Sequence, residues 1–361
     1  MSGGRRIRVA VLGGGRSSEH DVSVRSAESV AAALDPERYE VVPVEIDRAG
    51  HWEIGDARLS LEPGAESAAL GPAAPDEDAR AGLPERAAGG LPAQVGQIDV
   101  VLPILHGPFG EDGRLQGLLD MAGLPYVGSG VAASALTMHK GQVKHVLRGE
   151  GIAVANHVAL RNRRLGETEA LQVDLLGYPC FVKPANLGSS VGISKVHRRE
   201  ELAAAVELAF RHDPVVLVEE MIEGREVEVG VLGNDDVLVS PPGEIVIVNE
   251  SDWYDYAAKY DEGAMDLRVP PDLPGPVIEE LRDTARRAFQ VCECAGMARI
   301  DFFVTPDHRV VLNEINTIPG FTSTSVYAKL FEAAGISYAE LLDRLIALAL
   351  ERHAQAQTYE Y

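Results

Sequence analysis

Basic residues are few in this 361-residue chain, in which 33 lysines and arginines stand against 55 aspartates and glutamates. The formal net charge is therefore −22. Proteins that bind nucleic acid carry a basic patch that meets the phosphate backbone. This deficit argues against nucleic acid and against anionic membranes as partners. It leaves room for a small anionic ligand held by a few well-placed lysines.

Cysteine is also scarce. The three cysteines, Cys180, Cys292 and Cys294, are an odd number and give no disulfide framework. The C-x-C pair has no matching group of Cys and His elsewhere. We therefore expect buried thiols in a helix rather than metal ligands.

Long apolar runs are absent as well. No run is long enough to span a bilayer, and the apolar stretch near the N-terminus is too short for the core of a signal peptide. Together with the few cysteines, this predicts a cytoplasmic, reducing location. The length suggests two or three domains, and 46% hydrophobic residues are ordinary for a globular protein.

An acidic hairpin is the most informative stretch of the chain. Residues 299–304 and 310–316 read as two strands, and they carry Asp301, Glu314 and Asn316. Side chains two apart on a strand share a face. Three oxygen ligands on one face predict a Mg²⁺ site, whose remaining ligands would be water and the phosphates of a nucleotide. The alternative is an exposed hairpin whose acidic side chains face water.

The register of this hairpin follows from its turn. Thr305 to His308 has turn chemistry. A loop of even length would pair Val304 with Arg309 and Asp301 with Leu312. That register puts Asp301 on the face of the two acceptors that follow.

The N-terminal region predicts a doubly wound α/β domain. A short apolar strand, residues 7–12, runs into Gly13-Gly14-Gly15 and a helix from about 22 to 34. The third glycine of a dinucleotide fingerprint is missing, so a dehydrogenase is a weak alternative. Glu19 suits an ammonium group, or it complements the helix dipole. His106 follows the strand at 98–105, where ligands bind in such sheets.

Later segments suggest a phosphate site and a closing loop. Lys183 ends a strand and precedes the Gly/Ser loop 184–192, which is not a P-loop because G-K-[ST] is absent. A plain hairpin loop is the alternative. Tyrosines crowd residues 254–260, and we expect a loop over 245–260 that can close, or simple packing. Residues 49–97, rich in Ala, Gly, Pro, Glu and Arg, read as a surface insertion without chemistry.

Seven segments in order resemble the D-alanine–D-alanine ligase family of the ATP-grasp superfamily. They are G-G-x-S-S-E-H (14–20), L-H-G-x-x-G-E-D-G-x-L-Q-G (105–117), V-G-S-G-x-x-A-S-A (127–135), V-K-P-x-x-x-G-S-S-V-G (182–192), Y-D-Y-x-x-K-Y (254–260), R-I-D (299–301) and N-E-I-N-T-x-P-G-x-T-x-x-S (313–325). They cover nearly the whole chain.

The resemblance implies an N-terminal doubly wound α/β (pre-ATP-grasp) domain, residues 1–139, followed by a two-lobed ATP-grasp fold. The lobes would span residues 140–232 and 233–361. It also implies ATP-dependent ligation of two D-alanines through a D-alanyl phosphate, for peptidoglycan synthesis. The resemblance further implies two Mg²⁺ (or Mn²⁺) ions and a homodimer.

The resemblance also assigns nucleotide and metal contacts. The metal ligands would be Asp301, Glu314 and Asn316. The ATP phosphates would meet Lys140, Lys183 and Lys259 under a lid of Gly188, Ser189 and Ser190. The adenine linker would be Glu219, Met221 and Ile222, and the ribose acceptor Glu226. One departure is His139, which precedes Lys140 where the family usually has Asp.

The substrate contacts follow in the same way. Glu19 would hold the ammonium of the first D-alanine, with His106 near its carboxylate. Arg299 and the Gly320 amide would donate to the oxyanion, and Ser325 would meet the second carboxylate. Ser189 and Tyr260 would form a hydrogen-bonded set with Glu19.

Two other functions stay open on the sequence. The resemblance implies that Tyr260 favours an amine nucleophile, hence a dipeptide, because relatives that make D-Ala-D-lactate lack this tyrosine arrangement. Another carboxylate–amine ligase, such as a D-Ala-D-Ser ligase, is the nearest rival. A non-catalytic ATP-binding protein is a more distant one, because binding alone does not need the oxyanion donor Arg299.

Overall fold

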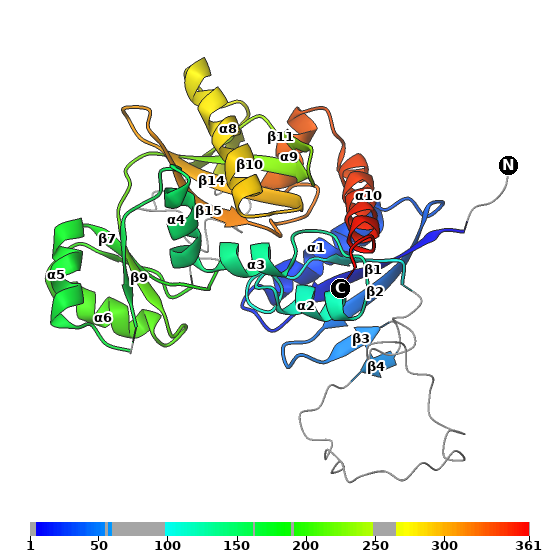
Figure 1. The fold of residues 1–361 in the computed structure, drawn as a ribbon, viewed down its shortest axis with the longest axis horizontal. Coiled ribbons are helices and arrows are strands. Elements are labelled where there is room, and N and C mark those ends of the chain that lie inside the picture. The colour runs from blue at the N-terminus through cyan, green and yellow to red at the C-terminus, as the bar shows by residue number, and fades with distance from the viewer. Residues whose placement is uncertain are drawn as a thin grey trace, which may run out of the picture.

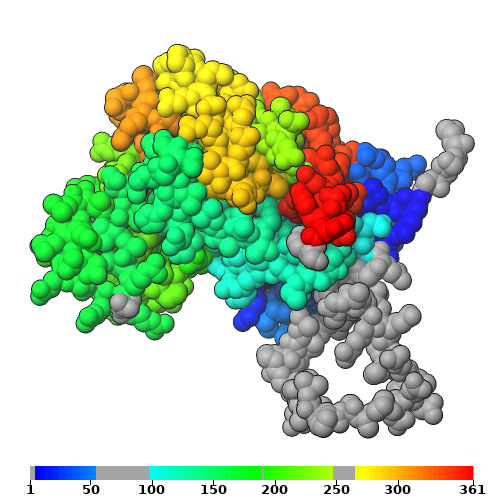
Figure 2. Space-filling view, viewed as in Figure 1, coloured from blue at the N-terminus to red at the C-terminus, as the bar shows by residue number. Residues whose placement is uncertain are grey.

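The computed structural model describes residues 5–54, 57–59, 98–161, 163–188, 191–247 and 265–360. Three β-sheets organise these residues (Figure 1). In the space-filling view the small lobe, in green, forms one end of the molecule, and the blue N-terminal strands lie toward the other (Figure 2).

The N-terminal sheet has the order β4-β3-β2-β1-β5. Its strands are β1 (Ile7–Gly14), β2 (Tyr39–Ile46), β3 (Trp52–Ile54), β4 (Ala57–Leu59) and β5 (Val100–Pro103). β1 is parallel to β2 and β5, whereas β3 and β4 are antiparallel additions. β5 and the second half of β1 are buried on both faces, as expected for strands inside a sheet covered on both sides, whereas β2 carries Glu40 and Glu45 and is only partly buried.

Helices cover both faces of this sheet, which confirms the doubly wound prediction. One face packs on α1 (His20–Ala33) and the C-terminal helix α10 (Tyr338–Ala356). The other face packs on α2 (Arg114–Met121). α3 (Val131–Met138) and α4 (Lys140–Gly149) lead onward to the second part of the chain.

The small sheet has the order β6-β9-β7-β8 and is antiparallel. It comprises β6 (His157–Leu160), β7 (Cys180–Pro184), β8 (Ser194–Val196) and β9 (Val216–Glu220). Its apolar face packs on α5 (Glu167–Leu176) and α6 (Arg199–Ala209). The alternation of the strands puts Lys183 and Glu219 on the opposite face.

The large sheet has the order β13-β12-β10-β14-β15, with β11 beside β10. Its strands are β10 (Arg225–Gly233), β11 (Val237–Val239), β12 (Gly243–Ile247), β13 (Met265–Arg268), β14 (Gly296–Val304) and β15 (Val310–Asn316). α8 (Gly275–Val291) covers its apolar face, and α9 (Val326–Ala333) packs against β10. These sheets confirm the two-lobed architecture.

Three sequence expectations differ from the structure. β10 pairs with β14 along its whole length, so residues 225–232 belong to the large sheet rather than to the small lobe. β3 and β4 fall inside the stretch predicted as a patternless insertion; residues 60–97 lie outside the described part. Cys292 and Cys294 are buried as predicted, but they follow the end of α8 instead of lying in it.

None of the helices in the described ranges combines the length and the apolar character needed to cross a membrane.

Candidate active site

The acidic hairpin brings its three predicted ligands together, but by a different register. Val304 pairs with Val310, and the connection is five residues long rather than four. This register alone would set Asp301 opposite Asn313. A shift between Asp301 and Phe302 inserts one extra residue in β15, so Asp301 instead faces Glu314.

The β-bulge therefore places both carboxylates on one face of the sheet. Asn316, two residues after Glu314, joins them and donates from Nδ2 to Oδ2 of Asp301 at 2.9 Å. The shared face was predicted correctly, while the pairing of Val304 with Arg309 and of Asp301 with Leu312 was wrong. A sequence carries no clear mark of a bulge at this point.

Neighbouring strands extend this polar face. Glu226 and Glu228 on β10 lie opposite Phe303 and Asp301 of β14. On β14 the even-numbered side chains from Ala298 to Val304 are buried in the core, so the odd-numbered ones face the cleft. One sheet face thus presents the predicted ribose acceptor, the oxyanion donor and the metal ligands.

Arg299 is held between two carboxylates. Its Nε and Nη2 donate to Asp301 at 2.8 Å each, and Nε lies 2.9 Å from Oε2 of Glu228. Burial opposes the charge, but these carboxylates raise the pKa of Arg299 above its ordinary value. Within the described part of the chain these carboxylates engage Nε and Nη2, which leaves Nη1 able to donate to a ligand.

Lysines from two elements approach this face from the other lobe. Nζ of Lys140 donates to the Leu187 carbonyl at 2.5 Å and lies 4.0 Å from Oε2 of Glu314. Nζ of Lys183 lies 2.5 Å from Oε2 of Glu219. Burial raises the pKa of Glu219, but the charges of Lys144 and Lys183 lower it. The lysines outweigh burial, so the pKa lies below its ordinary value. The other oxygen of Glu219, Oε1, is buried and has no hydrogen-bond partner among the described residues.

A cavity of about 400 Å³ opens between the N-terminal domain and the large lobe. Its lining includes eight of the site residues predicted from the sequence: Glu19, His106, Gly188, Arg299, Glu314, Asn316, Gly320 and Ser325. Residues that are 306 positions apart in the chain meet here, which no local pattern can establish.

The loop after Lys183 comes close to Glu19. A Cβ atom added to Gly188 would lie 3.1 Å from Oε2 of Glu19. Glycine at this position lets the loop backbone pass beside the carboxylate. The predicted neighbours Ser189 and Ser190, and also Lys259 and Tyr260, lie outside the described residues.

Ser325 and Gly320 belong to one turn. Oγ of Ser325 accepts from the Thr322 amide at 2.9 Å, and Ser325 immediately precedes α9. A Cβ on Gly320 would lie 3.5 Å from this hydroxyl. The turn therefore presents a hydroxyl and a glycine backbone to the same cavity.

His106 and Glu111 fix the start of this turn. Nδ1 of His106 lies 3.0 Å from the Ile318 carbonyl, and Oε1 of Glu111 accepts from the Ile318 amide at 3.2 Å. A carbonyl can only accept, so Nδ1 carries the hydrogen. Burial lowers the pKa of His106, although Glu19 opposes the shift. Its buried Nε2, without a partner in the described ranges, is then an acceptor. It suits an ammonium donor better than the predicted carboxylate contact.

Glu111 predicts a distinct pH dependence of stability. Burial and the Glu19 carboxylate raise its pKa to about 8, against an ordinary value of 4.5. Its contribution to stability is therefore present below about pH 4.5 and is lost as pH rises to about 8. Glu111→Gln cannot ionise. In thermal unfolding from pH 5 to 9, the unfolding temperature of the variant should rise relative to that of wild type as pH rises. Parallel curves would contradict this assignment.

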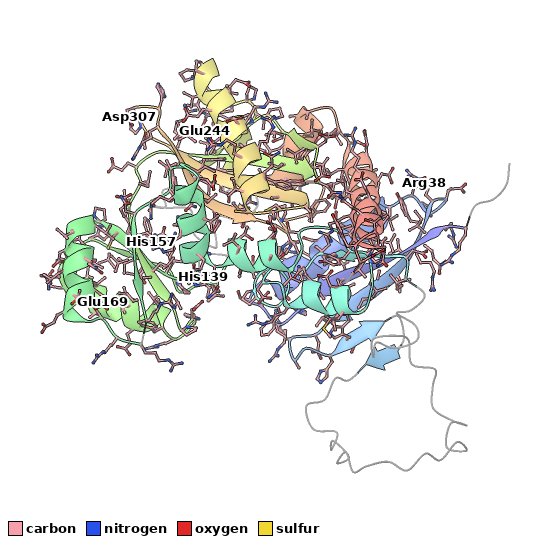
Figure 3. The ribbon with its side chains drawn as sticks, viewed as in Figure 1. Arg38, His139, His157, Glu169, Glu244 and Asp307 are labelled. Atoms are coloured by element: carbon pink, nitrogen blue, oxygen red, sulfur yellow. The ribbon has the colours of Figure 1, made fainter. Side chains whose placement is uncertain are left out.

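His139, the departure from the family pattern, caps a helix. Its Nδ1 accepts from the Gln142 amide at 3.3 Å at the start of α4. Asp is also a good N-cap residue. His139 therefore keeps the helix start that presents Lys140, and it lies close to that end of α4 (Figure 3).

Two family models match most of the chain. The one described as "D-ala D-ala ligase N-terminus" matches residues 8–129, and "D-ala D-ala ligase C-terminus" matches residues 146–347. The chain belongs to the D-alanine–D-alanine ligase family. This confirms the resemblance drawn from the seven motifs.

Curated relatives of this ligase family cover nearly the full length. A D-alanine–D-alanine ligase A from Chromobacterium violaceum is 46% identical over 96% of both chains. A D-alanine–D-alanine ligase from Deinococcus radiodurans is 48% identical over 95% of this chain and 98% of its own.

Solved structures of ligases share the fold of this chain. A D-alanine–D-alanine ligase from Coxiella burnetii has a TM-score of 0.79 at 34% identity, covering 98% of this chain and 96% of its own. One from Bacillus anthracis, complexed with ATP, has a TM-score of 0.74 at 27% identity and covers 97% and 99%. A D-Ala:D-Ser ligase from Enterococcus faecalis also has a TM-score of 0.79, at 32% identity, covering 96% and 100%. The ligase family makes the dehydrogenase alternative untenable.

Two cavity residues escaped the sequence reasoning. Glu228 pairs with Arg299, and its signal was its position two residues after Glu226 on one strand. Glu111 lies inside the L-H-G-x-x-G-E-D-G segment. It was missed because an acidic residue in a loop ordinarily faces water. Both contribute through buried contacts that depend on the tertiary fold.

Proposed function

We propose that this protein ligates two D-alanine molecules to D-alanyl-D-alanine with ATP, through a D-alanyl phosphate, releasing ADP and phosphate. The observation that carries the proposal is that groups from two domains line one cleft. It holds a carboxylate and a buried histidine from the N-terminal domain, and an arginine, acidic ligands and a glycine turn from the large lobe. Membership of the ligase family supports the same reaction.

The oxygen ligands fit Mg²⁺. Two carboxylates, Asp301 and Glu314, and the amide of Asn316 share one face beside a cleft that has room for phosphates. Hard oxygen donors of this kind suit Mg²⁺, which keeps other positions for water and phosphate. The described ranges hold no cluster of three or more His, Cys, Asp or Glu side chains suited to a metal ion, and the third ligand proposed here is an amide. Bound Mg²⁺ neutralises charge on the transferred phosphoryl group.

The first half-reaction activates a carboxylate. Glu19 accepts from the ammonium of the first D-alanine and so directs its carboxylate toward the γ-phosphate of ATP. Lys140 and Lys183 hold the phosphates from the opposite lobe. One carboxylate oxygen attacks the phosphorus, and ADP leaves. Positioning supplies most of the acceleration in such a transfer.

The second half-reaction forms the peptide bond. The amine of the second D-alanine, held through its carboxylate at Ser325, attacks the acyl carbon. The tetrahedral oxyanion that results accepts from Nη1 of Arg299 and the Gly320 amide. The C–O bond then breaks, and phosphate leaves with the former carboxylate oxygen. The second D-alanine attacks as the free amine, its ammonium having released one proton to solvent, and the extra proton on the new amide nitrogen leaves with the phosphate.

Several finer features belong to this proposal. The lid serines, Lys259 and Tyr260 close over the acyl phosphate and exclude water. The product serves peptidoglycan synthesis, the enzyme acts in the cytoplasm, and it forms a homodimer as the family usually does.

Phosphate release from Mg·ATP tests the proposal, with products identified by mass. The substrates are D-alanine, L-alanine, D-serine plus D-alanine, and D-lactate plus D-alanine. D-alanine alone should give phosphate and D-alanyl-D-alanine in equal amounts. A preferred mixed product would overturn the role of Tyr260 and the second-site assignment. ATP binding without turnover would favour the non-catalytic alternative.

A further inference from the structure

Lys144 is a wholly buried cation that the proposed reaction does not use. It lies on α4 one turn after Lys140, and its side chain is 0% exposed. Lysine is almost never fully buried unless it is paired. Its partners therefore indicate what it does.

Those partners come from both lobes. Nζ of Lys144 donates to the carbonyl of Asn313 at 3.2 Å and lies 3.6 Å from Oε2 of Glu219. Asn313 lies on β15 of the large sheet, and Glu219 lies on β9 of the small sheet. A single ammonium group thus joins the two sheets.

The contact at Asn313 falls on the bulge itself. The ladder pairs Phe302 with Leu312 and then Asp301 with Glu314, so Asn313 is the extra residue. β15 is the edge strand of its sheet, and the carbonyl of an extra residue leaves the ladder and needs another donor. Lys144 supplies that donor. Without the bulge, Glu314 would turn to the other face of the sheet.

The contact at Glu219 falls on the nucleotide side. Its Oε2 is shared by Lys144 and Lys183, and its Oε1 has no partner in the described part of the chain. A donor on a bound nucleotide would therefore complete Glu219 and fix the position of Lys144.

We propose that Lys144 is a positioning residue that couples nucleotide binding at Glu219 to metal binding at Glu314. The coupling rests on the proposed function, because it requires both ligands to occupy this cleft. A nucleotide that orders Glu219 orders Lys144 and hence the bulge, and the effect is reciprocal.

Calorimetry of ADP binding to the whole protein tests the coupling without turnover. The quantity is the ratio of the ADP dissociation constant in EDTA to that in saturating Mg²⁺. Lys144→Met removes the donor while Lys183 still pairs with Glu219. It should lower the ratio about 10-fold, as supporting contacts of metal ligands typically do.

Val143→Ala is the matched control. Val143 is the buried neighbour on the same helix and packs in the hydrophobic core of the large lobe. This variant should lower the unfolding temperature and leave the ratio unchanged. An unchanged ratio in Lys144→Met, beside Mg²⁺-linked binding in wild type, would overturn the coupling alone.

A second variant covers the case in which Lys144→Met does not fold. Lys144→Gln keeps an N–H donor but loses the charge toward Glu219. It should lower the ratio in the same direction by a smaller factor, and a wild-type ratio would overturn the coupling. Wild-type protein that binds no ADP would overturn the proposed function, and the coupling with it.

Discussion

Replacing Arg299 with methionine is expected to lower kcat for dipeptide formation by about 100- to 1000-fold, the usual effect of removing one oxyanion donor. Two of its nitrogens hold Asp301 and one of these also approaches Glu228, while Nη1 is available to the cavity. Phosphate release and dipeptide formation would be measured together. Both should fall, and the KM for ATP should change much less.

The same substitution also has a stability effect. Asp301 and Glu228 would lose their common cation, and breaking a buried pair by removing one partner is destabilising by about 3–5 kcal/mol. Arg299→Lys restores the charge without the fork that holds Asp301. It should recover stability more than activity. Wild-type kcat in a folded Arg299→Met protein would contradict the oxyanion role.

Replacing Glu314 with glutamine is expected to lower kcat/KM by about 100-fold or more, because metal binding at the phosphoryl group supplies several kcal/mol. Higher Mg²⁺ should recover part of the loss. The bulge turns this side chain to the cleft face, where we propose that it binds the metal, and its neutral isostere changes charge while leaving packing intact. Activity against Mg²⁺ concentration is the measurement.

The same hairpin provides the control for this variant. Asp307 lies in the exposed turn of the hairpin, where it accepts from Oγ1 of Thr305 (Figure 3). Asp307→Asn removes an equal charge from the same hairpin but far from the cleft face. It should leave the Mg²⁺ dependence unchanged. Equal losses in both variants would show that net charge, and not ligation, decides the effect.

The hairpin also illustrates what a sequence can predict. The alternation of acidic and apolar residues identified the strands and the polar face, because side-chain direction is a local property. The predicted register of the hairpin was wrong by one residue. The bulge at Asn313 offsets this difference, so that Asp301 and Glu314 still share a face. Bulges depend on tertiary contacts, here the buried ammonium of Lys144, and no local pattern encodes them.

The candidate site divides in the same way. Motifs located Glu19, Arg299 and Gly320, whose spacing in the chain is that of the family. Glu111 and Glu228 were missed, because their roles come from burial and from partners on other elements. The membership of β10 in the large sheet was missed for a related reason. β10 pairs with β14 about 70 residues later in the chain, and the sequence of neither strand specifies its partner.

Oxygen transfer tests the central claim, activation of a carboxylate as an acyl phosphate, most directly. D-alanine labelled with ¹⁸O in its carboxylate would be incubated with the enzyme and Mg·ATP, and the released phosphate analysed by mass. One carboxylate oxygen forms the bond to phosphorus and leaves with it. One ¹⁸O in each phosphate, in step with dipeptide formation, is therefore predicted. Phosphate free of ¹⁸O alongside normal dipeptide formation would contradict the account.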